Sequence, residues 1–151
     1  MRILVISDSH GNTRNIERAV ESQPEANIII HLGDGADDIV DLEFVYRDKQ
    51  FYQVAGNCDW GSSLPLEGEL KVADKTIFFV HGHEYRVKTN LQQIKMEARK
   101  RNADIVLFGH THLPITEYDD ELYLLNPGSL QYADGTYGII DITDAGISVQ
   151  I

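Results

Sequence analysis

Five runs of apolar residues in this chain each lead directly to a side chain that can bind a metal ion. The runs cover residues 3–6, 28–30, 51–54, 77–80 and 105–108. Continuous apolar runs of this length predict strands that are covered on both faces of a sheet. Because ligands of open α/β sheets bind beyond the carboxyl ends of the strands, we expect the polar side chains after these runs to gather at one rim.

The side chains that follow the runs offer oxygen and nitrogen atoms of the kind that divalent metals bind. They are Asp8, His10, Asp34, Asn57, His81, His110 and His112. Seven such ligands at one rim are enough for two ions, and the metal pairs of hydrolytic sites lie about 3.5–4 Å apart. The pattern therefore indicates a hydrolase.

Each motif alone has a simpler explanation. Asp8 and His10 could form a hydrogen-bonded loop pair, and Asp34 after a glycine fits a turn. Asn57 followed by Cys58 and an aspartate fits an Asx turn. The combination decides in favour of metal, since all but one of the six histidines fall inside motifs that follow predicted strands.

The remaining polar residues near the motifs receive other roles. Asp59 is interpreted as an acceptor that orients a ligand, rather than as a ligand itself. His83 is a candidate for substrate binding or proton transfer, with an ordinary surface histidine as the alternative. His31 lies within an apolar run and is interpreted as a hydrogen-bonded core residue, and Asn12 as a helix cap.

Length and charge limit the class of protein. A chain of 151 residues is expected to form one domain, residues 1–151, with a substantial core. A net charge of −11 argues against binding of extended nucleic acid, and no apolar run is long enough to cross a bilayer or to form a signal peptide. Cys58 is the only cysteine, which excludes an internal disulfide and fits the cytoplasm.

The alternation of patterns predicts an α/β architecture. Strands are expected at about 2–7, 27–32, 50–55, 66–73, 75–81, 104–108, 115–118, 121–125, 137–142 and 147–151, and helices at about 12–22, 36–46 and 89–101. Thr89 and Gln92 are predicted to form a capping box for the third helix, and Asp37, Asp38 and Asp41 the solvated acidic start of the second. We expect a parallel sheet from the first half, a second mixed sheet from later hairpins, and helices outside both.

The motifs D-x-H, G-D, G-N-x-D, H-G-H and G-H-T-H, in this order from Asp8 to His112, resemble the calcineurin-like metallophosphoesterase superfamily. The chain is most similar to its small single-domain prokaryotic phosphodiesterase branch, and N-P-G-S at 126–129 extends the resemblance. The resemblance implies a four-layer α/β/β/α sandwich of two mixed sheets flanked by helices, with a dimetal site at the sheet edges. It assigns Asp8, His10 and His112 to one ion, Asn57, His81 and His110 to the other, and Asp34 to a bridge between them.

One position departs from the superfamily pattern. Many of its phosphatases have histidine where this chain has Cys58, and a thiol is a poor substitute in assisting a leaving group. This departure favours diesters over monoesters and leaves His83 or a metal-bound water as the acid.

The predicted activity is therefore dimetal-dependent hydrolysis of small phosphodiesters by in-line attack of a metal-bridging hydroxide. Asp34, Asn57, His83 and Asp59 are its expected catalytic residues. Imidazole ligands favour Mn²⁺, Fe, Zn²⁺ or Ni²⁺ over Mg²⁺, and Mn²⁺ is the first choice. Two alternatives stay open. One is a phosphomonoesterase, and the other is a protein-interaction scaffold without turnover, as in a eukaryotic retromer subunit that resembles this fold.

Overall fold

Ten strands form two five-stranded sheets in the computed structural model, which describes residues 1–151. The first sheet has the order β10-β9-β1-β2-β3 and the second the order β4-β5-β6-β8-β7. The strands of the first sheet are β1 (Arg2–Ile6), β2 (Ala26–His31), β3 (Gln50–Gln53), β9 (Gly138–Thr143) and β10 (Gly146–Gln150). Those of the second are β4 (Glu67–Val72), β5 (Lys75–Val80), β6 (Ile105–Leu107), β7 (Ile115–Asp119) and β8 (Leu122–Asn126).

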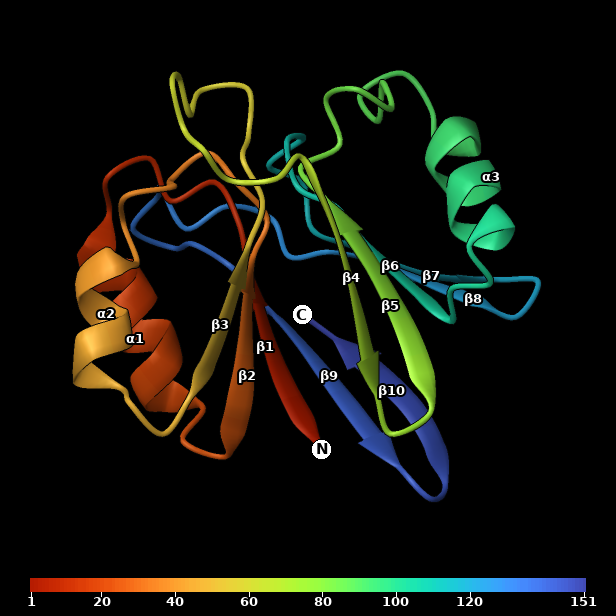
Figure 1. Ribbon diagram of the computed structural model, residues 1–151, viewed down its shortest axis with the longest axis horizontal. Coiled ribbons are helices and arrows are strands. Elements are labelled where there is room, and N and C mark those ends of the chain that lie inside the picture. The colour runs from red at the N-terminus through yellow and green to blue at the C-terminus, as the bar shows by residue number, and fades with distance from the viewer.

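The two sheets face each other, and the helices cover their outer faces (Figure 1). Helices α1 (Thr13–Ser22) and α2 (Val40–Val45) lie outside the first sheet, and α3 (Gln92–Lys100) lies outside the second. Three buried clusters match these layers. One lies between the sheets and includes Ile30 and Phe79, one lies under α1 and α2, and one lies under α3. The predicted four-layer sandwich of two mixed sheets is confirmed.

Strand direction brings the predicted metal ligands to one edge. β1, β2 and β3 are parallel to one another, and so are β5, β6 and β8. The carboxyl ends of these strands therefore lie at the same edge of each sheet. The loops that follow them meet at the top of the molecule in Figure 1.

Two details of the predicted helices are wrong. Thr89 and Gln92 form no capping box, because Gly82–Asn90 is taken up by turns and α3 begins only at Gln92, with Leu91 at its N-cap. Asp38 is not part of a solvated helix face. Its carboxylate instead accepts hydrogen bonds from Ser9 Oγ and the Gly11 N–H, and α2 begins two residues later.

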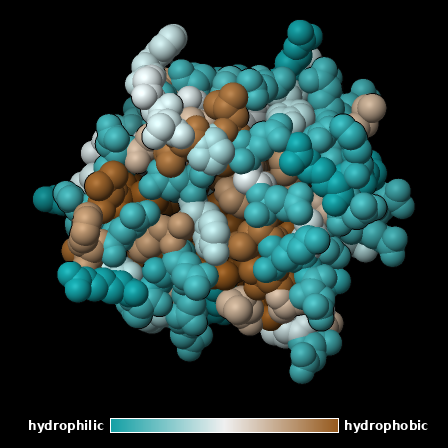
Figure 2. Space-filling view, viewed as in Figure 1, coloured by the Kyte–Doolittle hydropathy of each residue, from teal (hydrophilic) through white to brown (hydrophobic).

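Asn12 caps α1 as predicted, accepting the Asn15 N–H at 3.2 Å. None of the three helices has the length and apolar character that a membrane span requires. The face in Figure 2 is mostly hydrophilic, with hydrophobic atoms near α2 and along the line where the two sheets meet.

Candidate metal centre

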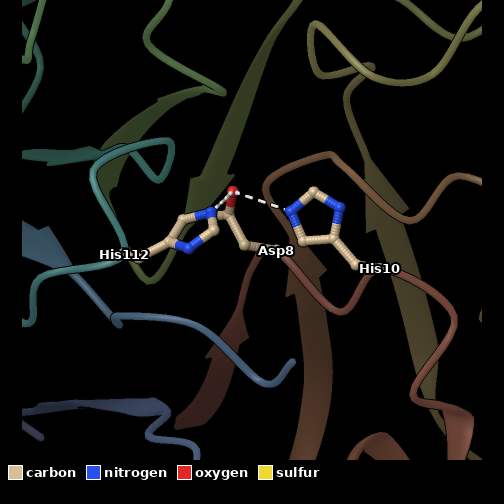
Figure 3. A group of neighbouring side chains, drawn as sticks. All are labelled: Asp8, His10 and His112. Atoms are coloured by element: carbon tan, nitrogen blue, oxygen red, sulfur yellow. Dashed lines mark ion pairs between the residues drawn. The ribbon is translucent and has the colours of Figure 1, made fainter. Parts of the chain in front are cut away.

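The first ligand group lies between the two sheets, with Asp8 and His10 after β1 and His112 after β6. Asp8 Oδ1 lies 3.0 Å from His112 Nε2 and 3.9 Å from His10 Nε2. Figure 3 shows both imidazole rings turned toward the same carboxylate of Asp8. One ligand atom from each of the three residues lies within 4.8 Å of the other two, which is compact enough for a single ion.

The second group adjoins the first and consists of Asp34 after β2, His81 after β5 and His110 after β6. Asp34 Oδ2 lies 3.4 Å from His81 Nε2 and 3.8 Å from His10 Nε2. Asn57 Oδ1 lies 3.1 Å from the same His81 nitrogen. The Asp34 carboxylate thus stands between a ligand of the first group and a ligand of the second.

The donor set fits cations because oxygen and nitrogen atoms that can ligate a metal converge on one another. Asp8 Oδ1 is fully buried and has no hydrogen-bond partner, although His112 Nε2 is 3.0 Å away. His81 Nδ1 donates to the Leu32 carbonyl at 2.7 Å. Although burial lowers it, the pKa of His81 is raised by Asp34 and Asp8. A bound ion would take the place of the Nε2 proton that faces the Asn57 oxygen. A backbone acceptor on the far nitrogen is the usual way in which a metal-binding histidine is oriented.

Neighbouring groups set the protonation states of Asp34 and His110. Although burial raises it, the pKa of Asp34 is held far below its usual range by His81 and the Cys58 N–H. Burial lowers the pKa of His110 to about 4, and the positive charges of His81 and Lys88 act in the same direction. An ionised carboxylate and a neutral imidazole are the states in which these groups bind metal.

A model of the calcineurin-like phosphoesterase superfamily domain matches residues 1–145. The chain belongs to this superfamily. The phosphodiesterase MJ0936 of Methanocaldococcus jannaschii is 29% identical over 160 residues, with 93% of each chain covered.

Solved structures share the fold. A predicted phosphoesterase from Streptococcus pneumoniae is 27% identical with a TM-score of 0.81, over 98% of this chain and 86% of that one. A single mutant of Vps29 from Entamoeba histolytica gives a TM-score of 0.75 at 20% identity, over 99% of this chain and 97% of its own. At that identity the likeness concerns the fold alone.

Five of the candidate ligands of this phosphoesterase have left-handed backbone. The φ angles are positive for Asp8 (53°), His10 (45°), Asp34 (56°), His110 (67°) and His112 (60°). Such values are uncommon outside glycine, and they cluster at functional sites where the chain turns sharply. In each case the turn comes directly after a strand and places the ligand side chain at the end of that strand.

Two glycines let the ligand loops approach each other. A Cβ on Gly109 would collide with Ser7 Oγ and lie 2.7 Å from Asp8 Oδ2. A Cβ on Gly56 would collide with the Asp34 carboxylate and backbone. The glycines that precede His110 and Asn57 are therefore required for close approach of the loops.

Asp59 bonds to backbone next to the centre and to none of the ligand side chains. Its Oδ2 accepts the N–H groups of Asp34 and Gly56, and its Oδ1 accepts those of Gly35 and Ala36, all within 2.9 Å. These four bonds lower the pKa of Asp59, although burial opposes them. Asp59 thus orients the backbone that carries Asp34, which is a more indirect role than orientation of a ligand side chain.

His83 lies beside the second group. Its ring centroid is 5.5 Å from that of His81 and 6.1 Å from that of His110. Its Nδ1 is buried without a hydrogen-bond partner. His31, by contrast, is fully buried between Ser9 Oγ and the Gly33 N–H, so it supports the loop and cannot reach an ion.

Three further residues support the ligands; Ser7 was not predicted from the sequence, whereas Asn126 and Ser129 belong to the N-P-G-S motif that extends the resemblance. Ser7 Oγ donates to Asp8 Oδ2, and Ser129 Oγ donates to the Asp8 carbonyl at 2.8 Å. Asn126 Nδ2 donates to the Gly109 carbonyl at 2.9 Å and to Thr111 Oγ1. The N-P-G-S segment therefore holds both ligand loops through their backbone carbonyls.

A hollow of about 500 Å³ lies away from this chemistry. It is lined by α1 residues such as Asn15 and Arg18 and by the segment around Leu130 and Tyr137. None of the candidate ligands contributes to it. The polar rim, rather than this hollow, is the candidate active site.

Proposed function

We propose that this chain is a dimetal phosphodiesterase acting on small phosphoesters. The observation that carries the proposal is the position of Asp34 Oδ2, 3.8 Å from His10 Nε2 and 3.4 Å from His81 Nε2. A carboxylate between two groups of imidazoles is suited to two neighbouring ions, because it can ligate both.

The proposed ligands divide as the sequence resemblance implies. Asp8, His10 and His112 would hold one ion, Asn57, His81 and His110 the other, and Asp34 both. Two bound divalent ions would supply a water nucleophile activated at neutral pH and would neutralise charge on the phosphoryl oxygens. Imidazole-rich sets suit Mn²⁺, Fe, Zn²⁺ and Ni²⁺, and we propose Mn²⁺.

The chain's own residues orient these groups and the substrate. Ser7 and the His110 N–H hold Asp8 Oδ2, which leaves Oδ1 directed at the imidazoles. The Cys58 N–H holds Asp34 Oδ1 at 2.8 Å and leaves Oδ2 directed at His10 and His81. Lys88, whose charge acts on His110, is suited to attract the phosphate.

A preference for diesters is supported by the residue at position 58. Cys58 lies with His10 and Asp34 in one group, where many superfamily phosphatases carry histidine. Burial and the neighbouring Asp34 raise the pKa of this thiol, so it is a weak acid for an alkoxide leaving group. MJ0936 is itself named a phosphodiesterase. We propose that His83 moves the proton instead.

The alternative is a binding scaffold of the same fold. Against it stand all seven ligand positions, together with the buried and unpartnered Asp8 oxygen, which a scaffold has no need to keep. We further propose that residues 1–151 act as one domain in the cytoplasm. The family match over 1–145 supports the domain, and a single free thiol fits the compartment.

The test is hydrolysis of bis(p-nitrophenyl) phosphate by metal-stripped protein, with and without added Mn²⁺. We expect turnover only after reloading. Asp34→Asn should abolish it, because the amide keeps the Cys58 contact but removes the oxygen that faces the imidazoles. Asp144→Asn, at an exposed turn, is the matched control. Lack of turnover in protein with two ions verified bound, or full turnover by Asp34→Asn with verified metal, would contradict the proposal.

A further inference from the structure

The loop between β3 and β4 carries the most exposed large hydrophobic side chain of the molecule. Trp60 is 91% exposed, and it is the only tryptophan in the chain. The loop rises above the sheet edge where the ligand loops meet (Figure 1). Tryptophan is normally well buried, and it is enriched where it contacts a ligand or partner.

The loop is anchored at several points. The Trp60 N–H donates to the Cys58 carbonyl at 3.0 Å, and the Ser62 N–H donates to the Asp59 carbonyl at 3.2 Å. The Asp59 side chain accepts the four backbone bonds described above. The Ala55 N–H closes the base of the loop on the Pro65 carbonyl at 2.8 Å. An indole on an anchored loop loses little further freedom on binding, which favours affinity.

A hollow of about 270 Å³ adjoins the indole, and Cys58 in its lining connects it to the metal centre. Trp60 and Cys58 both line it, and the Cys58 thiol lies within 4.8 Å of ligand atoms of His10 and Asp34. Whole small-molecule pockets are about 300–1,000 Å³, so this hollow suits one part of a substrate. A phosphodiester held at the ions would have one arm directed into it.

The lining favours a flat ring that carries hydrogen-bond donors. Every nucleobase offers a π face, and stacking on aromatic side chains tolerates any base. Asp37, which lines the hollow together with Trp60, offers an acceptor to base N–H groups. Its negative charge disfavours an additional phosphate. Among biological phosphodiesters, nucleosides supply planar arms with such donors, whereas glycerol and sugar arms do not.

We propose that Trp60 is a specificity-determining residue that stacks on the nucleobase of one arm, so that the preferred substrates are nucleoside phosphodiesters. This inference rests on the proposed function, since it assigns the substrate class of the same site. It predicts that removal of the indole weakens binding of ring-bearing substrates while the hydrolytic centre stays intact.

The emission of the sole tryptophan tests ring binding without any turnover. Zn²⁺-loaded protein would be titrated with adenosine 5′-monophosphate and, as the control without a base, with ribose 5-phosphate. We expect saturable quenching by the nucleotide alone. Binding of the nucleotide, measured by calorimetry, without a change in emission would overturn the proposal. Equal quenching by both ligands would overturn it too.

Kinetics separate this proposal from the proposed function. Thymidylyl-(3′→5′)-thymidine and glycerophosphoglycerol both have alkoxide leaving groups, but only the first carries nucleobases. Trp60→Ala should lower kcat/KM for the dinucleotide roughly tenfold, mainly through KM, since stacking of one base is commonly worth that much. Trp60→Phe should retain most of it, and glycerophosphoglycerol should be cleaved as before.

Phe44→Ala, which removes another exposed ring on α2, is the matched control and should change neither rate. Equal losses on both substrates, or no loss on either, would overturn the role of Trp60. If wild-type protein with bound metal cleaves no diester at all, the proposed function fails. The emission titration then still decides whether Trp60 binds the base. A change in Trp60 emission that only a protein partner produces would count against the proposal.

Discussion

His83 differs from the other rim histidines because it belongs to neither compact ligand group, yet its buried Nδ1 has no partner. If it moves a proton to the leaving group, its importance should grow as the leaving group becomes poorer. We expect His83→Ala to lower kcat about 100-fold or more on methyl phenyl phosphate, and much less on bis(p-nitrophenyl) phosphate.

The matched variant is Cys58→Ala, which should show no such dependence on the leaving group. Metal content would be measured for both proteins. A uniform loss on both substrates, or a leaving-group dependence that follows Cys58 instead, would assign the proton transfer elsewhere.

Asp59 is expected to control stability through four backbone N–H groups. Asp59→Asn keeps one acceptor oxygen and turns an amide toward two donors, so at least two partly buried N–H groups lose their partner. We predict a loss of about 2 kcal/mol or more in the free energy of unfolding. Urea unfolding measures it, with Asp41→Asn on α2 as the exposed control. Wild-type stability of Asp59→Asn would show that the network contributes little.

At this scale the sequence predicted the residues that belong to a motif, missed Ser7, and indicated the N-P-G-S segment without the contacts that it makes. All seven candidate ligands follow apolar runs, which placed them at one rim. Ser129 reaches Asp8 across 121 positions in the chain, and Asn126 reaches Gly109 across 17. The sequence could not show these contacts, because N-P-G-S fits an ordinary turn as well as the superfamily pattern.

At the scale of elements, β1 and β9 are joined across the first sheet by a bidentate pair. Arg2 Nε and Nη2 each donate to Asp141 at 2.9 Å. The Arg2 guanidinium holds the pKa of Asp141 below its usual range. The pair therefore contributes stability above the ordinary carboxyl pKa of about 4, and that contribution is lost as the pH falls through the depressed value.

We predict that Asp141→Asn lowers stability at pH 7 and flattens the decline of stability between about pH 4 and more acidic values. Because both side chains are partly exposed, the effect should shrink in high salt. Urea unfolding at pH 7 and pH 3 measures this, with Asp144→Asn in the adjacent turn as control. An acid decline as steep in Asp141→Asn as in wild type would contradict the prediction.

Strands were easier to predict from the sequence than helix starts. All ten predicted strands are present, because buried runs and hairpin turns such as the one at Ala73 and Asp74 leave a local signal. The start of α3 was wrong because Thr89 and Gln92 match a capping box while the turns after Gly82 occupy that segment. Arg86 has a φ of 54° there, which interrupts any helix.

At the scale of the whole molecule, the candidate ligands connect the two sheets. Asp8, His10, Asp34 and Asn57 follow strands of the first sheet, whereas His81, His110 and His112 follow strands of the second. Bound ions should therefore stabilise the packing of one sheet on the other. At a free metal concentration about 100 times Kd, the expected gain is about 2.7 kcal/mol for one site.

We predict that metal-stripped protein unfolds at a lower Tm than reloaded protein, and that His81→Ala loses much of the difference. Calorimetry with and without chelator measures both, and Asp144→Asn should keep the full difference. Equal Tm values for stripped and reloaded wild-type protein, with binding verified, would mean that the ions do not link the sheets.

The left-handed backbone at five candidate ligands has a consequence for protein engineering. At about 1 kcal/mol each, such residues cost about 5 kcal/mol, comparable to the whole net stability of an ordinary domain. A sequence optimised for this backbone by stability alone would place glycine at these positions, because glycine adopts positive φ without strain. The optimised protein would be more heat-resistant and would have no metal centre, so a thermostable enzyme from this scaffold must be designed with these five residues held fixed.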